Sequence, residues 1–64
     1  MEMEIKLSTI YVITPQKEAG PDEHSNVVKL CFPDSGALVI IYNSGSCYAY
    51  SKDQWETFHT EIVR

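Results

Sequence analysis

The stretch of sequence that decides the fold is residues 27–50, VVKLCFPDSGALVIIYNSGSCYAY. It holds three apolar runs separated by two turn signals. In the first turn, Pro-Asp-Ser-Gly at residues 33–36, proline presets φ, aspartate bonds to the local backbone and glycine accepts a positive φ. The second signal is Ser44-Gly45, a typical hairpin connection. We therefore predict antiparallel strands at residues 27–32, 37–43 and 47–50.

A further strand is predicted upstream, at residues 3–14. Met3, Ile5 and Leu7 alternate with polar residues, which is the period of a half-buried strand. From residue 10 to residue 13 the chain is continuously apolar, so either both faces are covered there or a β-bulge near Ser8 and Thr9 switches the phase. Pro15 ends the strand. Residues 15–26 are polar and contain two of the three prolines, so we expect a long loop.

The last part of the chain carries the signals of a helix start. Ser51 is a candidate N-cap, and Gln54 follows at the spacing of a capping box. Tyr50 and Trp55 fit a hydrophobic staple. Trp55, Phe58 and Ile62 then recur at the spacing of one helical face. We therefore predict one C-terminal helix.

Together these elements predict a single domain over residues 1–64 of the α+β class. It consists of a four-stranded antiparallel sheet, a meander or small barrel, followed by the helix. A chain of this length buries only about 60% of the surface that its unfolded form exposes. Such domains often gain stability from a disulfide, a metal or a partner chain.

The simplest hairpin registers place Phe32 opposite Ala37 and Tyr42 opposite Cys47, which sorts the strands into two faces. The first face carries Tyr48 and Tyr50, and the staple to Trp55 predicts that the helix covers it. Both tyrosines are therefore expected to pack in the core.

The second face carries Leu38, Ile40 and Tyr42 in its central strand, with Lys29 on the neighbouring strand. A solvated face of an antiparallel sheet normally shows polar residues, and this one does not. Either the apolar run at residues 10–13 curls over it, or another chain buries it. On the second alternative, the protein interface consists of Leu38, Ile40, Tyr42 and Lys29.

The composition limits the classes of partner. Nine acidic and five basic side chains give a formal net charge of −4, so a phosphate backbone is an unfavourable partner and nucleic-acid binding is not expected. Tyr42, Tyr48 and Tyr50 would suit a stacking platform for single strands, but such platforms sit among basic residues. No apolar stretch has the roughly 20 residues of a membrane span, and the first residues are acidic, so we expect a cytoplasmic protein.

The sequence offers no catalytic, cofactor or metal motif, and we expect no enzyme activity and no small-molecule substrate. No glycine-rich phosphate loop or nucleophile elbow occurs. His24 and His59 have no metal-ligand spacing to each other or to the cysteines, and both are expected on the surface. In the predicted register Cys31 and Cys47 lie too far apart for a disulfide, so both are expected to be small buried residues.

Residues 38–58, with the run LVIIYNSGSCYAYS followed by Trp55 and Phe58, resemble the core of the KTSC domain. That family is a small strand-rich module with a Ser-Gly turn, a Tyr-x-Tyr strand and a helix. The resemblance implies a nucleic-acid-associated module. In size and acidity the chain also resembles phage-encoded inhibitors of host proteins.

Three functions follow from these observations. The first is a non-enzymatic protein-interaction module, an inhibitor that sterically occupies a nucleic-acid-handling partner protein. The second is the KTSC-like nucleic-acid-associated module. The third is a structural dimer in which the partner is a second copy of the chain.

Overall fold

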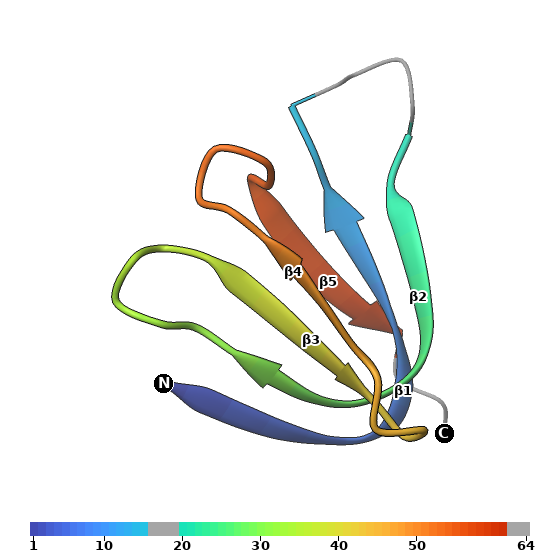
Figure 1. Cartoon of the computed structure of the whole chain (residues 1–64). Helices are drawn as coiled ribbons and strands as arrows, with labels where there is room; N and C mark the ends of the chain where they lie inside the picture. Colours follow the sequence, from blue (N-terminus) through green and yellow to red (C-terminus); the bar gives the residue numbers. More distant parts are fainter. Residues whose placement is uncertain (16–19, 62–64) are drawn as a thin grey trace.

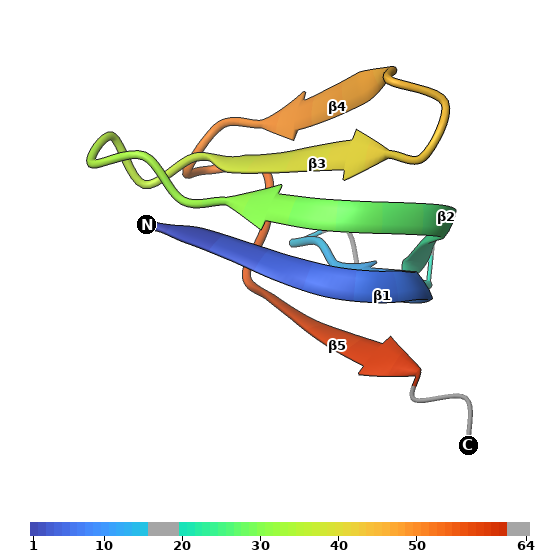
Figure 2. The same ribbon diagram turned by 90° about the horizontal axis from the view of Figure 1, so that it is seen from below.

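The computed structural model describes residues 1–15 and 20–61, which form one antiparallel sheet of five strands. The strands are β1 (Glu2–Ile13), β2 (Asp22–Cys31), β3 (Leu38–Tyr42), β4 (Cys47–Tyr50) and β5 (Thr57–Glu61). Figure 1 shows the five strands, and their order across the sheet, β4-β3-β2-β1-β5, can be followed in Figure 2. The predicted α+β class is therefore wrong, because the described residues contain no helix and the fold is all-β.

The predicted helix is replaced by a turn and by strand β5. Gln54 does accept a hydrogen bond from the Ser51 amide (3.0 Å), as a capping box requires, but the chain makes one turn only. From Thr57 the exposure alternates with period two: Phe58 and Thr60 are half-buried, while their neighbours are exposed. Phe58 and Ile62 are four residues apart, a spacing that suits one helical face and one strand face equally. Ile62 itself lies outside the described residues.

Strand β5 forms because the side of β1 that does not pair with β2 has free backbone groups to which another strand can bond. Residues 9–13 of β1 pair with residues 57–61, while the same part of β1 pairs with β2 on its other side. β-Branched Thr57 and Thr60 favour the pleated backbone of a strand. β1 therefore lies between β2 and β5, and residues 9–13 are all at least half-buried.

Of the two alternatives predicted for residues 10–13, the structure contains the β-bulge near Ser8 and Thr9. The register against β2 shifts between Glu4 and Ser8 and again between Ser8 and Ile10. Before it, Met3 and Ile5 pack against the core, and after it Ile10 and Val12 are fully buried. The bulge thus moves the inward-facing positions from odd to even numbers, which keeps apolar side chains on one side.

The sheet curls around its inner face because β1 and β2 bend along their length (Figure 1), while β4 and β5 lie at its opposite edges (Figure 2). β4 and β5 remain the two edges, so the sheet does not close. The core on the inner face consists of Ile10, Val12, Val27, Leu30, Leu38, Ile40 and Tyr50. Trp55 and Phe58 pack against this core with Phe32, and the Trp55 indole N–H donates to the carbonyl of Gly36 (3.0 Å).

Both hairpin registers differ by one residue from the predicted ones. Cys47 pairs with Ile41 instead of Tyr42, because Gly45 at φ 94° lets the chain form a three-residue loop in which its amide bonds to the Tyr42 carbonyl. Cys31 pairs with Val39. A slip of one residue exchanges the two faces of a strand. The positions predicted to need an external cover are therefore the ones that the chain covers itself.

The predicted loop 15–26 is shorter than expected. β2 begins at Asp22, five residues before the predicted start, and residues 16–19 lie outside the described part of the chain. No helix among the described residues is long and apolar enough to cross a membrane.

Candidate binding site

The four residues predicted to form an interface are separated by the fold. Leu38 and Ile40 have exposed fractions of 0% and lie in the core beside Ile10 and Val12. The alternative in which the first strand covers this face therefore holds. Lys29 is half-buried on the outer face, where it forms an ion pair with Glu2. Only Tyr42 takes part in the polar site described next.

A chain of hydrogen bonds links side chains of three strands at one end of the inner face. His24 of β2 lies between two hydroxyls: Nδ1 is 2.5 Å from Tyr42 Oη of β3, and Nε2 is 2.6 Å from Tyr50 Oη of β4. Tyr50 also donates to Asp22 Oδ2 at 2.8 Å. A tyrosine hydroxyl has one proton, so Tyr50 must accept from His24, which carries its hydrogen on Nε2. Tyr42 then donates to Nδ1. We call Tyr42, His24, Tyr50 and Asp22 the polar chain.

The pKa shifts of His24, Tyr42 and Tyr50 all favour the neutral forms of these side chains. Burial lowers the pKa of His24, and the charge of Asp22 opposes this only in part. Burial also raises the pKa of Tyr50, to which the hydrogen bond and the charge of Asp22 add. The pKa of Tyr42 is raised by its burial and by Tyr48. Both hydroxyls therefore stay protonated near neutral pH, as donors rather than bases or nucleophiles.

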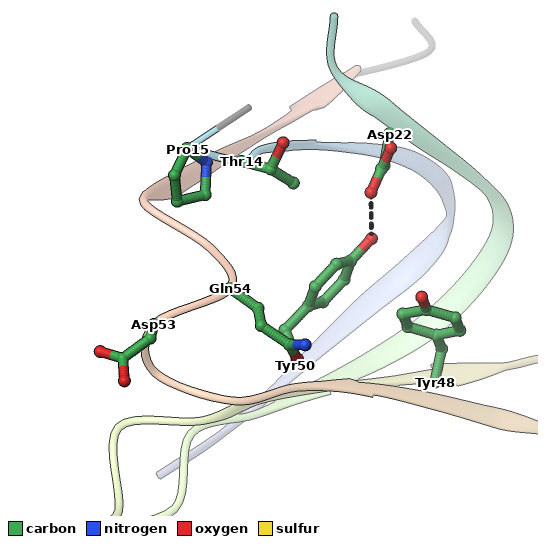
Figure 3. Close-up of a pocket in the computed structure, with 7 residues that line it drawn as sticks. All are labelled: Thr14, Pro15, Asp22, Tyr48, Tyr50, Asp53 and Gln54. Atoms are coloured by element: carbon green, nitrogen blue, oxygen red, sulfur yellow. Dashed lines mark hydrogen bonds between the residues drawn. The ribbon is translucent and has the colours of Figure 1, made fainter. Parts of the chain in front are cut away.

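A cavity of about 360 Å³ lies beside the polar chain, between β4 and the ends of β1 and β2. Its lining residues are Thr14, Pro15, Asp22, Tyr48, Tyr50, Asp53 and Gln54 (Figure 3). Asp22 and the Tyr50 hydroxyl meet inside it, whereas Asp53 stands at its rim with the carboxylate turned outward. We call this cavity the tyrosine pocket. It falls in the size range of small ligand sites, about 300–1,000 Å³.

Tyr48 gives the tyrosine pocket an accessible aromatic wall. Its side chain is 49% exposed, although its ring lies 4.9 Å from that of Tyr50 and 5.3 Å from that of His24, measured between ring centroids. The expectation that Tyr48 packs in the core is wrong, while that for Tyr50, 4% exposed, is confirmed. A ring held by neighbours and open on one side suits contact with a partner, because little side-chain entropy remains to be lost.

Two carboxylates line the tyrosine pocket. Asp22 and Asp53 are among its lining residues, and none of the described residues that line it is a lysine, arginine or histidine. Lys52 precedes Asp53, but its side chain runs against Gly36 in the 33–36 turn. Within the described residues, Tyr50 bonds to Oδ2 of Asp22 and Oδ1 is left to accept from a ligand.

Sequence reasoning missed His24 and Asp22 as members of a site. They were assigned to a polar loop, whereas β2 already includes them. The sequence carries no period-two signal at this point, because Asp22, Glu23, His24 and Ser25 are all polar. The alternation of half-buried Asp22 and His24 with exposed Glu23 and Ser25 is a feature of the structure.

The cysteines are both free, as predicted, but they are not both buried. Cys31 is half-buried and Cys47 is exposed. They lie on the outer face because the register change exchanged the faces. Among residues 1–15 and 20–61, no group of three or more histidine, cysteine or carboxylate side chains is arranged to hold a metal ion.

No family model, curated protein or solved structure matches the chain. The resemblance of residues 38–58 to the KTSC domain therefore stays a prediction. The function is inferred below from the geometry of the site.

Proposed function

We propose that this protein is a non-enzymatic protein-interaction module that holds a basic side chain of its partner in the tyrosine pocket. The observation that carries the proposal is the combination of an exposed aromatic ring, Tyr48, with a carboxylate, Asp22, in a cavity lined by no basic side chain among residues 1–15 and 20–61. An arginine guanidinium would bond to Asp22 and stack on Tyr48. A lysine ammonium would make the same contacts with fewer hydrogen bonds.

The polar chain supports this role by fixing the walls of the pocket. Tyr50 is hydrogen-bonded to Asp22 and to His24, and His24 is hydrogen-bonded to Tyr42 on the neighbouring strand β3. Asp22 is thereby held in place before a ligand arrives. Preorganisation of this kind lowers the entropy cost of binding, because fewer side chains have to be ordered when the ligand binds.

The overall charge extends the attraction beyond the pocket. A net charge of −4 favours approach by a basic protein surface. Proteins that bind nucleic acid carry such surfaces. On this proposal the chain would act on such a partner as a steric inhibitor, by occupying basic residues that otherwise contact phosphate.

The proposal is tested by an NMR titration of the labelled protein with a short blocked peptide that contains arginine. We expect amide shifts at Asp22, Tyr48 and Tyr50, and none with the same peptide in which citrulline replaces arginine. The Asp22→Asn variant keeps the acceptor for the Tyr50 hydroxyl but removes the charge, and we expect it to bind about tenfold more weakly.

Glu4→Gln is the matched control for Asp22→Asn. Glu4 is an exposed carboxylate on the outer face, paired with Lys29 in register, so its removal changes the net charge by the same amount away from the pocket. Equal weakening by the two variants would show only a general charge effect. Equal affinity for the arginine and citrulline peptides would contradict the proposal.

A further inference from the structure

Strand β4 is an edge of the sheet. Its neighbour is β3, and among residues 1–15 and 20–61 no strand pairs with its other side. Edge strands present unpaired N–H and C=O groups that can template the addition of another strand. The tyrosine pocket lies directly beside this edge, because Tyr48 and Tyr50 of β4 are among its lining residues.

The pairing pattern shows which backbone groups of β4 are free. The Tyr42 amide donates to the Ser46 carbonyl at 2.9 Å, so residues 42 and 46 form a hydrogen-bonded pair. Hydrogen-bonded and non-hydrogen-bonded pairs alternate along an antiparallel ladder. Tyr48 and Tyr50, opposite Ile40 and Leu38, therefore bond to β3. The amides and carbonyls of Cys47 and Ala49 point away from the sheet.

We infer that the partner segment binds as an added antiparallel strand on β4 and thereby delivers its basic side chain to the tyrosine pocket. This inference rests on the proposed function, since the same pocket receives the side chain. The occupant is an extended segment of a basic protein. The carboxylates that line the pocket favour a basic side chain on this segment, and the free edge of β4 favours an extended backbone.

The geometry also fixes the pattern of the segment. Side chains of an added strand alternate between the two faces of the sheet. Residues opposite Tyr48 and Tyr50 lie on the inner face, where the pocket accepts an arginine or lysine. Residues opposite Cys47 and Ala49 lie on the outer face, beside small, exposed side chains. The segment therefore alternates basic residues with residues of moderate size, such as valine or threonine.

The test uses a blocked pentapeptide, acetyl-Thr-Arg-Val-Arg-Thr-amide, and the full chain. In the inferred register the central valine lies opposite Ala49 and exchanges two hydrogen bonds with it, whereas the arginine amides point away from β4. Methylation of the valine nitrogen should weaken binding about tenfold, because one hydrogen bond is lost and its partner is left unpaired. Methylation of either arginine nitrogen is the matched control and should leave the affinity within about twofold.

Hydrogen exchange gives a second readout that does not depend on peptide chemistry. The inferred mode predicts that the peptide slows exchange of the Cys47 and Ala49 amides. If all methylated peptides bind equally and these two amides stay unprotected, the strand mode is overturned while the pocket proposal stands. If no arginine peptide binds, both are overturned.

A second copy of the chain could occupy the same edge, and sedimentation distinguishes this case. We expect the sedimentation coefficient of a monomer, with Cys47 and Ala49 amides unprotected, before peptide is added. A dimer whose Cys47 and Ala49 amides are already protected would overturn the inference, since the edge would serve self-association instead.

Discussion

The inner face of the sheet has two halves of different character, although the same strands contribute to both. One half is dry: Ile10, Leu38 and Ile40 are fully buried. The other half, one or two residues along each strand, holds the polar chain and the open tyrosine pocket. Strand β3 contributes to both, through Ile40 and then Tyr42. The difference teaches that a domain this small can bury one part of its inner face completely and still keep a polar pocket open beside it.

The comparison is tested most severely by truncation in the dry half. Ile40→Ala should lower the free energy of unfolding by about 2–5 kcal/mol, because it removes a buried side chain and leaves a cavity. A single core of this size supplies about 3–5 kcal/mol in all, so the variant should be largely unfolded. Far-UV circular dichroism and urea denaturation measure the change.

Ile41→Ala is the control for this loss. Ile41 is half-buried on the outer face, so we expect a clearly smaller effect. A larger loss for Ile41→Ala than for Ile40→Ala would show that the register is shifted by one residue, and the division of the inner face would fail with it.

Removal of one hydroxyl from the polar half should have an intermediate effect. Tyr50→Phe keeps the ring but deprives both His24 Nε2 and Asp22 of their partner, which should cost about 1–3 kcal/mol in urea denaturation. Tyr48→Phe is the control, because the hydroxyl of Tyr48 forms no hydrogen bond with the described residues and its ring is half exposed. Equal losses for both variants would mean that the polar chain contributes nothing to stability.

The smallest expected effect is the dependence of stability on pH through His24. Its folded pKa lies below the usual 6.5, because burial disfavours the charged ring. Above pH 6.5 the ring is neutral in both the folded and the unfolded state, and its full contribution to the free energy of unfolding is present. As the pH falls below 6.5 and through the lower pKa of the folded state, the unfolded chain binds the proton more tightly, so this contribution is lost.

Urea denaturation between about pH 8 and pH 5.5 measures this loss, and His24→Gln should reduce it. Asp22, Tyr42, Tyr48 and Tyr50 all contact or face the His24 ring, and of these only Asp22 favours its protonation. His59→Gln is the matched control, since His59 is exposed on β5 and stacks on Tyr11. A curve that stays unchanged in His24→Gln would show that His24 is not coupled to folding.

The turns and the bulge were predictable because local chemistry determines them. Gly36 and Gly45 both take positive φ, at 87° and 94°, as the turn signals indicate. Ser8 marks the bulge because the apolar alternation changes phase around it. The exact register of the hairpin was not predictable, since it depends on the loop geometry around Gly45. A difference of one residue in this register was enough to exchange the inner and outer faces of a strand.

The site and the last strand were harder to predict because tertiary pairing decides them. The capping hydrogen bond between Ser51 and Gln54 does form. The residues that follow nevertheless pair with the free edge of β1, so they form a strand instead of a helix. The polar chain joins residues 18 to 28 positions apart in the sequence. Such contacts leave no local signal in the sequence of either strand.

The pairing of β1 with β5 has a consequence for how the chain reaches its native state. The Tyr11 hydroxyl of β1 donates to the Glu61 carboxylate of β5, 50 residues away in the sequence. Contacts over such separations make folding slow, on the scale of milliseconds to seconds for all-β domains. During synthesis on the ribosome, the half of β1 around Tyr11 can pair with β5 only after the 50 residues that separate Tyr11 from Glu61 have been made.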